Sequence, residues 1–496
     1  MSSVSSSMGT PDEPGAAASG SDDRAGPLIG IRVIEVGAPP GEYCGLLLAG
    51  LGAEVIKVEP SSGAPSRKIG PFPEGKDDGD SSLFFLAYNR AKRSVIIDID
   101  SDDGRRQLTQ LASTADVWLE SATSGPEVVA RLEPAALRET FPRLVVARMT
   151  PFGDTGPWAD YRATDLVSLA LGGVLMNCGY DPGVDGIYDL PPSWPHAFHS
   201  FHIAGEQLAM GIMTALYWRL KTGQGQFISC SIHEAVSKCT EVDLMSWVML
   251  RQPFFRQTCR HSAPEPVTAP TIAHTKDGRW LNAMSLSEKD RGTLRRYLAG
   301  KGIGEAPDES GEPPSLARKV PGTGNMGSEE ELRDIELVQR LTRKSLFADL
   351  PWREAQEDQL MWAPVRKPHE SLADDHWQAR RTFEPIDHPE RGGTLLYPAR
   401  KWLSTEPSWS AGRRAPALGA DNDLLRAMTP PQFAPPPAAG AVMRAIFTSP
   451  RSRDRDPSTP WALEGVRILD FSWFLASAGG TRFLSAFGAD CIKVEW

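Results

Sequence analysis

The sequence near the C-terminus of this chain repeats the sequence near its N-terminus. Residues 28–59 and residues 463–495 align position for position with one single-residue gap, and both end in the run Gly-Ala-x-x-Ile-Lys-Val-Glu. A repeat separated by this much chain is far too long a period for a solenoid, so it marks a second copy of a whole domain. We therefore predict one complete domain followed by the first part of its twin.

The chain of 496 residues is longer than a single hydrophobic core supports, which agrees with more than one structural unit. From repeat and composition we expect a disordered tail, one complete domain, a Pro-rich linker and the start of a second, incomplete copy. These lie at residues 1–26, 27–425, 426–461 and 462–496.

Short apolar runs rich in β-branched residues and bounded by turn residues are typical of buried parallel strands. The chain has such runs at residues 31–36, 53–58, 94–99, 116–119 and 144–149. Helical patterns lie between and after them, for example at residues 102–115, 205–221, 232–249 and 335–348. This order predicts an α/β fold built on an open, doubly wound parallel sheet.

Composition excludes several classes of partner. The formal net charge is −10 and no block of Lys and Arg is present, so we do not expect a nucleic acid. No apolar run approaches the roughly 20 residues that span a bilayer, so we do not expect a membrane. Six scattered cysteines and the absence of a signal-peptide pattern favour reduced thiols and a cytoplasmic location. His196, His199 and His202 lack matching carboxylates, so we predict no metal site.

Seven motifs occur in an order that is typical of one enzyme family. They are GLGAEVIKVEP at residues 50–60, NRAKRSVIIDI at 89–99, FGDTGPW at 152–158, RLKTGQGQFISCSIHEA at 219–235, KDGRWL at 276–281, APV at 363–365 and ALGADNDLL at 417–425. Over about residues 27–425 the chain resembles the family III CoA-transferases. This family includes formyl-CoA and carnitine-CoA transferases and the 2-methylacyl-CoA racemases.

The resemblance implies a family III CoA-transferase fold, in which a Rossmann-like large part is joined to a smaller α+β domain. We place these parts at about residues 27–245, with a C-terminal helix, and at about residues 265–400. It also implies CoA or acyl-CoA as substrate, a small carboxylic acid as second substrate, and no permanently bound cofactor. Family members form interlocked homodimers, so we expect either that assembly or a tandem pseudo-dimer within one chain.

In the transferases that this chain resembles, an aspartate attacks the acyl-CoA thioester and gives a mixed anhydride. The freed CoA thiolate then returns to form an aspartyl-CoA thioester, which the acceptor acid resolves. The matching stretch is residues 201–205, and its aspartate position holds Phe201. A phenyl ring can neither attack a thioester nor abstract a proton, and no Asp lies between Leu190 and Lys221. Glu206 is the nearest carboxylate.

Asp165 is our candidate catalytic residue. The racemases of the resembled family use a His-Asp pair at the head of a helix, and the matching pair here is Thr164 and Asp165. Their second base is the same aspartate that Phe201 replaces, so a racemase is a less favoured alternative. Because Asp is also a preferred N-cap, the other interpretation of Asp165 is a helix-capping residue.

Five residues fall where the family's CoA-contacting segments lie. Basic side chains there would pair with the 3′-phosphate and the diphosphate of CoA, whereas the alternative role is an ordinary salt bridge. The residues are Arg67, Asn89, Lys92, Arg93 and Arg131.

Two functional classes remain open. In the first, the protein is a CoA-transferase whose active carboxylate comes from the second copy. In the second, this domain is a catalytically silent acyl-CoA-binding half of a tandem protein. The residue that the second copy places at its equivalent of Phe201 separates these classes, because an aspartate there would restore the nucleophile.

Overall fold

The computed structural model describes most of the chain between residues 26 and 495. The described ranges are 26–75, 80–123, 133–195, 198–264, 266, 269–284, 288–304, 329–427, 460–472 and 475–495. The predicted tail and the predicted linker therefore lie almost wholly outside the described residues. Within these ranges, no helix is both long enough and apolar enough to cross a membrane.

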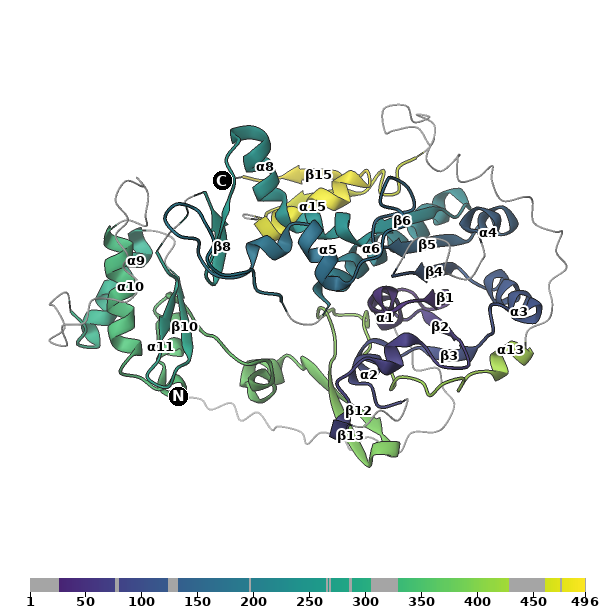
Figure 1. Ribbon diagram of the computed structural model, residues 1–496, viewed down its shortest axis with the longest axis horizontal. Helices are drawn as coiled ribbons and strands as arrows, with labels where there is room; N and C mark the ends of the chain where they lie inside the picture. The colour runs from purple at the N-terminus through teal and green to yellow at the C-terminus, as the bar shows by residue number, and fades with distance from the viewer. Residues whose placement is uncertain are drawn as a thin grey trace, which may run out of the picture.

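A parallel sheet of six strands lies at the centre of the large part of the molecule (Figure 1). Its strands are β1 (Arg32–Gly37), β2 (Glu54–Glu59), β3 (Arg93–Ile96), β4 (Val117–Ser121), β5 (Val145–Thr150) and β6 (Phe227–Ser231). The order β3-β2-β1-β4-β5-β6 changes direction between β1 and β4. The prediction of an α/β fold on a parallel sheet is confirmed, and such a switch point opens a crevice at the carboxyl ends of the strands.

Alternate residues of the strands pack against helices on opposite faces of the sheet. The helices are α1 (Glu42–Gly50), α3 (Asp102–Ser113), α4 (Pro134–Thr140) and α6 (His199–Thr222). Val33 and Val55 pack in one core cluster with α1 and α6, whereas Ile34 and Ile56 pack in another with α3 and α4. Each such side chain is fully buried and stabilises the fold by about 2 kcal/mol relative to exposure.

Shorter elements complete the large part. They are α2 (Leu83–Tyr88), α5 (Asp165–Leu171), α7 (Ile232–Ser237), α8 (Glu241–Leu250), β7 (Phe255–Gln257) and β8 (Arg260–Ala263). The helix predicted at 232–249 is two helices, because a 3-10 turn at Lys238–Thr240 separates α7 from α8. The helix predicted at 205–221 begins six residues earlier, at His199.

A smaller α+β unit stands apart from the central sheet (Figure 1). Its antiparallel strands β9 (Ile272–His274), β10 (Trp280–Met284) and β11 (Met361–Pro364) pair in the order β11-β10-β9. Helices α9 (Glu288–Gly300), α10 (Glu329–Thr342) and α11 (Trp352–Glu357) accompany them. Trp362, which is 1% exposed, lies in the core of this unit.

The chain then returns to the large part. Helix α12 (Asp375–Ala379) precedes a hairpin of β12 (Phe383–His388) and β13 (Gly393–Pro398), and α13 (Asp423–Ala427) closes the domain. Near α13, the side chains of Asp421 and Asn422 accept hydrogen bonds from the backbone N–H groups of Ser94 and Ile96 on β3. The outer strand of the sheet is therefore held by residues from the far end of the domain.

The C-terminal segment forms a small strand–helix–strand unit, drawn yellow in Figure 1. Its elements are β14 (Arg467–Asp470), α15 (Leu475–Ala486) and β15 (Asp490–Lys493), and the two strands pair in parallel. The unit is docked on the large part, because Lys221 of α6 donates a hydrogen bond to the Glu464 carbonyl at 2.7 Å and Arg482 pairs with Glu241 of α8.

This C-terminal unit has the geometry of the first β–α–β unit. Arg32 lies opposite Glu54 in the β1–β2 register, and Arg467 lies opposite Asp490 in the β14–β15 register. Both registers carry an ion pair between these residues, at 2.7 and 2.9 Å. The matching interactions agree with the sequence repeat, while the identity of 462–496 as part of a second domain stays a prediction.

We expect truncation after Ala427 to leave the first domain folded. The ion pair that joins the described part of the C-terminal unit to α8, Arg482–Glu241, lies at the surface and contributes at most about 1 kcal/mol. The thermal midpoint should fall by less than about 4 °C, measured by calorimetry. Unfolding of the large part on truncation would instead make the C-terminal unit an integral part of that fold.

Candidate functional site

A cavity of about 460 Å³ lies at the carboxyl ends of the first four strands. Residues that follow β1, β2, β3 and β4 all line it, including Ala38, Ser61, Ile99 and Ser121. The position matches the switch point of the sheet, where open α/β sheets bind their ligands. The volume is within the roughly 300–1,000 Å³ that is usual for small-molecule sites.

The turn after β1 is fixed against the end of β4. The Ala38 N–H donates to the Ser121 carbonyl at 2.9 Å, and the Ser121 hydroxyl donates to the Ala38 carbonyl at 2.6 Å. A Cβ atom on Gly41 would lie 2.6 Å from the Ser121 Oγ, so only glycine permits this approach. These contacts shape the wall of the cavity between the two strands.

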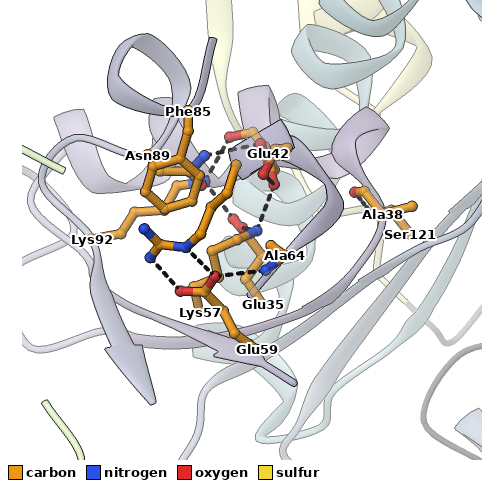
Figure 2. A network of polar contacts seen from close by, with 12 residues as sticks. Glu35, Ala38, Glu42, Lys57, Glu59, Ala64, Phe85, Asn89, Lys92 and Ser121 are labelled. Carbon is orange, nitrogen blue, oxygen red and sulfur yellow. Dashed lines mark hydrogen bonds and ion pairs between the residues drawn. The ribbon is translucent and has the colours of Figure 1, made fainter. Parts of the chain in front are cut away.

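A buried ionic network lies close to this wall (Figure 2). The Lys57 ammonium on β2 donates to Glu35 Oε1 at 2.9 Å and to Glu42 Oε1 at 2.7 Å. Glu35 and Lys57 are side by side in the β1–β2 register, and Glu42 is the first residue of α1. The three side chains are at most 3% exposed, so their charges are compensated within the protein.

Lys92 and Asn89 complete this network from the loop before β3. The Lys92 ammonium donates to Glu35 Oε2 at 2.7 Å, to the Glu42 carbonyl at 2.8 Å and to Asn89 Oδ1 at 3.0 Å. The Asn89 amide donates in turn to Glu42 Oε2 at 2.9 Å. The network therefore joins β1, β2, the head of α1 and the loop before β3.

Electrostatics keep Glu42 ionised although it is buried. Burial alone would raise the pKa of this carboxyl, but Lys57 and Lys92 lie beside it, and Lys57 and Ser66 donate hydrogen bonds to it. Together they hold the pKa of Glu42 below its usual value. The start of α1 adds a favourable helix dipole for an anion.

A second buried pair holds the loop after β2. The Arg67 guanidinium donates to both carboxylate oxygens of Glu59, at 2.7 and 2.8 Å, and to Asp80 at 2.6 Å. Its charge lies 3.8 Å from the centre of the Phe85 ring. The bidentate pair fixes the carboxylate of Glu59, a residue that lines the cavity.

The structure places the predicted CoA contacts in different surroundings. Arg67, Asn89 and Lys92 are at most 3% exposed. Arg67 and Lys92 form buried ion pairs with Glu59 and Glu35, and the Asn89 amide donates a hydrogen bond to Glu42. Arg93 is 32% exposed and pairs with Glu54 and Asp421. Arg131 lies outside the described residues. A direct contact of these side chains with CoA stays a prediction.

Phe201 lies in the first turn of α6, among aromatic rings. Its ring stacks on Phe198 at 5.4 Å between centroids, and Phe198 contacts Phe84 at 4.9 Å. Phe201 is 8% exposed and belongs to the core cluster that joins α1, α6 and the sheet. The position at which the resemblance places a nucleophile is therefore part of the apolar core.

Asp165 has a structural role that the sequence did not indicate. Thr164, and not Asp165, is the N-cap of α5, because the Thr164 hydroxyl accepts from the Val167 N–H. The Asp165 carboxylate instead accepts from the Ser200 N–H at 2.8 Å, the Ser200 hydroxyl at 2.7 Å and the Trp194 indole at 2.9 Å. It thus caps the start of α6 from a neighbouring helix, and a catalytic role for it stays a prediction.

This distant cap explains why α6 begins before Gly205. Phe198, the residue at the N-cap position, has a φ of 55° and no side-chain acceptor to offer. Asp165 supplies the missing acceptor, since the first N–H groups of a helix have no partner within it. The pairing depends on the tertiary fold, so no local signal in residues 195–205 could have predicted it.

Sequence reasoning missed several residues that shape the site. Glu35 and Lys57 interrupt apolar strands with charge, and this pattern could have predicted a buried ion pair. Glu42 and Ser121 offer no comparable signal, because their roles depend on contacts between strands. Among the described residues, no group of three or more His, Cys, Asp or Glu could hold a metal ion.

A model of CoA-transferase family III matches residues 28–422 and 463–496. This match covers most of the chain. The parallel sheet and the cavity at its carboxyl edge lie within the matched residues. The chain therefore belongs to CoA-transferase family III.

Individual relatives agree with this assignment. One subunit of the succinyl-CoA:(R)-benzylsuccinate CoA-transferase of Thauera aromatica is 28% identical over 390 residues, which cover 78% of this chain and 90% of that protein. A probable CoA-transferase of Mycobacterium tuberculosis is 27% identical over 463 residues, which cover 90% of this chain but 51% of that protein. The crystal structure of a CaiB/BaiF family protein from Brucella suis shares the fold, with a TM-score of 0.65, 24% identity and coverage of 81% of this chain and 99% of that chain.

We expect Glu42→Gln to destabilise the fold by about 3 kcal/mol, because it leaves buried Lys57 and Lys92 with one carboxylate fewer. The lowered pKa of Glu42 stabilises the folded state above pH 4.5, and this contribution is lost as the pH falls through the folded-state pKa. The difference between wild type and variant should therefore shrink in acid, measured by urea unfolding. Glu354→Gln, at a half-exposed pair with Lys301, is the control and should cost less than about 1 kcal/mol.

Proposed function

We propose that this protein binds acyl-CoA in the cavity at the carboxyl edge and takes part in transferring CoA between an acyl-CoA and a small carboxylic acid. The cavity itself is the observation that carries the proposal. Its walls include the carboxyl ends of β2 and β3, where the last residues of the GLGAEVIKVEP and NRAKRSVIIDI motifs lie. The relative from Thauera aromatica is named as an enzyme of this type.

We infer that the nucleophilic carboxylate comes from outside this copy. Phe201 occupies the expected position and Asp165 is engaged in three hydrogen bonds, so neither offers a free carboxylate here. The repeat of the first β–α–β unit supports a tandem pseudo-dimer, as does the length of the Mycobacterium tuberculosis relative, of which this chain spans about half. An interlocked homodimer is the other arrangement, but its second copy carries Phe201 at the same position and adds no carboxylate there.

The second candidate function is a catalytically silent acyl-CoA-binding half of a tandem protein. The burial of Phe201 in an aromatic cluster favours it, since that cluster stabilises the fold and does no chemistry. An acyl-CoA racemase is the weakest candidate, because Thr164 and Asp165 both serve as caps. All six cysteines are free, in agreement with a cytoplasmic location.

We expect CoA to bind with an affinity that depends on the rim of this cavity. Ser61→Trp would fill the entrance and should weaken binding at least about tenfold by calorimetric titration, whereas Ser193→Trp, at an exposed site elsewhere, should not. Asp98 is an exposed carboxylate of the rim, so Asp98→Asn should strengthen binding of the anionic ligand. Equal affinities for wild type and Ser61→Trp would show that CoA does not use this cavity.

We expect no covalent adduct when the wild-type protein is incubated with acyl-CoA. Phe201→Asp restores a carboxylate that can attack the thioester carbonyl, break the C–S bond and release CoA thiolate. Phe201→Asn loses the same aromatic contacts without gaining a nucleophile, so it is the matched control. Intact-mass spectrometry should detect a hydroxylamine-sensitive adduct in Phe201→Asp alone.

Two results would contradict this prediction. A stoichiometric adduct on Asp165 or Glu206 of the wild type would make that residue the nucleophile. A Phe201→Asp protein that binds CoA but forms no adduct would place the reaction centre elsewhere.

A further inference from the structure

A second cavity, of about 640 Å³, follows one face of α6. Glu206, Met210, Met213, Tyr217 and Leu220 line it, and their spacing of three and four residues places them on one face of the helix. The lined face runs along the helix for about 21 Å at the usual rise per residue. The residues that line the first cavity do not line the second, so the two cavities are distinct.

The walls facing α6 are mainly apolar and come from distant parts of the chain. Leu47 of α1, Trp402 and Trp409 line them, together with Leu463 and Leu484 of the C-terminal unit. The two indole rings pack edge to face, with 5.7 Å between centroids.

The tryptophans offer the cavity apolar surface. The Trp402 N–H donates to the Ser408 hydroxyl at 3.0 Å, and the Trp409 N–H donates to the Ala399 carbonyl. Because both donors already have partners in the protein, a ligand in the cavity meets the carbon atoms of these rings. Flat or extended apolar groups are the chemistry that such a surface binds.

The charge that lines the cavity is concentrated at the end nearest the start of α6. Arg219, near the other end, donates to Asp116 Oδ1 at 2.8 Å and is 7% exposed, so its charge is balanced inside the protein. Lys401 and Glu206 form the remaining pair, with 2.8 Å between Nζ and Oε1, and their side chains are 39% and 53% exposed. A ligand therefore meets one accessible cation, at one end of an apolar cavity.

One N–H donor of the Lys401 ammonium has no partner within the described part of the chain. An ammonium group carries three N–H donors, and within the described part of the chain those of Lys401 reach Tyr43 and Glu206. Burial lowers its pKa, but the hydrogen bonds to these two residues raise the pKa by more, so the group stays protonated at neutral pH. Glu206 is half exposed and can turn towards water when a ligand approaches.

We propose that this cavity binds an acyl group, whose apolar body lies between α6 and the two tryptophans and whose carbonyl oxygen accepts a hydrogen bond from Lys401. The oxygen belongs either to a free carboxylate or to a CoA thioester, since both present the same acceptor at the end of an apolar chain. This proposal adds an apolar acyl group to the proposed function. Binding of the acyl group does not depend on that function, whereas its transfer to or from CoA rests on it.

To test this proposal, the whole protein is titrated with octanoate, octanoyl-CoA and octanol. Binding is measured by tryptophan fluorescence and by calorimetry. Lys401→Met should weaken octanoate about tenfold, the effect of one charge-assisted hydrogen bond, and leave octanol unchanged. Met213→Trp fills the cavity and should weaken all three ligands at least about tenfold. Met249→Trp, on exposed α8 outside the cavity, is the matched control and should bind like wild type.

Leu220→Trp provides a second filling variant at a side chain that is 79% exposed, so a folding defect in Met213→Trp does not remove the test. Binding of octanoate supports a free acid as ligand, whereas binding of octanoyl-CoA alone, weakened by both filling variants, supports the thioester. Equal affinities in filling and control variants overturn the proposal. A change of oligomeric mass in Leu220→Trp, with no ligand bound, also overturns it and assigns the cavity to a protein contact.

The two proposals fail separately. Ser61→Trp should weaken CoA binding at least about tenfold and leave octanoate binding intact, whereas Met213→Trp should weaken octanoate and leave CoA binding intact. Loss of both ligands in Ser61→Trp would overturn the separate acyl cavity, while intact CoA binding in that variant would overturn only the proposed function.

Discussion

Two lysines and two glutamates buried together determine how the large part of this molecule is built. Moving an ion out of water costs several kcal/mol, so Lys57 and Lys92 can lie in the interior only with Glu35 and Glu42 beside them. The four side chains belong to β1, β2, the head of α1 and the loop before β3. Removing one partner therefore disturbs the register of two strands and the turn that lines the cavity at the carboxyl edge at the same time.

The same scaffold separates binding from chemistry. The first cavity lies at the position at which doubly wound sheets hold a ligand, whereas the start of α6 packs around Phe201. In the function that we propose, this domain presents acyl-CoA to a carboxylate from another copy. Further along α6, the apolar cavity ending at Lys401 offers the acyl group a place of its own.

Local patterns in the sequence predicted much of this fold, and tertiary contacts account for the rest. The five predicted strands agree with the structure to within a few residues, because β-branched runs such as 31–36 carry their own signal. The start of α6 could not be predicted, since Asp165 caps it across a fold-dependent contact. The contact of the Lys92 side chain with Glu35 could not be predicted either, because motif position does not reveal which side of a loop a side chain takes.

Because the β–α–β unit is duplicated, two segments of this chain can compete for the same place in the sheet during folding. Its β14 and β15 carry the register and ion pair of β1 and β2, so two segments of one chain offer similar edges to β3 and β4. Repeated domains with such edges can exchange strands and misassemble. Asp470 stands at the position of Glu35, but the segment between Asp470 and Asp490 contains no acidic residue to replace Glu42, so only the N-terminal unit brings two carboxylates to Lys57 and Lys92. Charge compensation thus favours the N-terminal unit over its repeat as the one that enters the sheet.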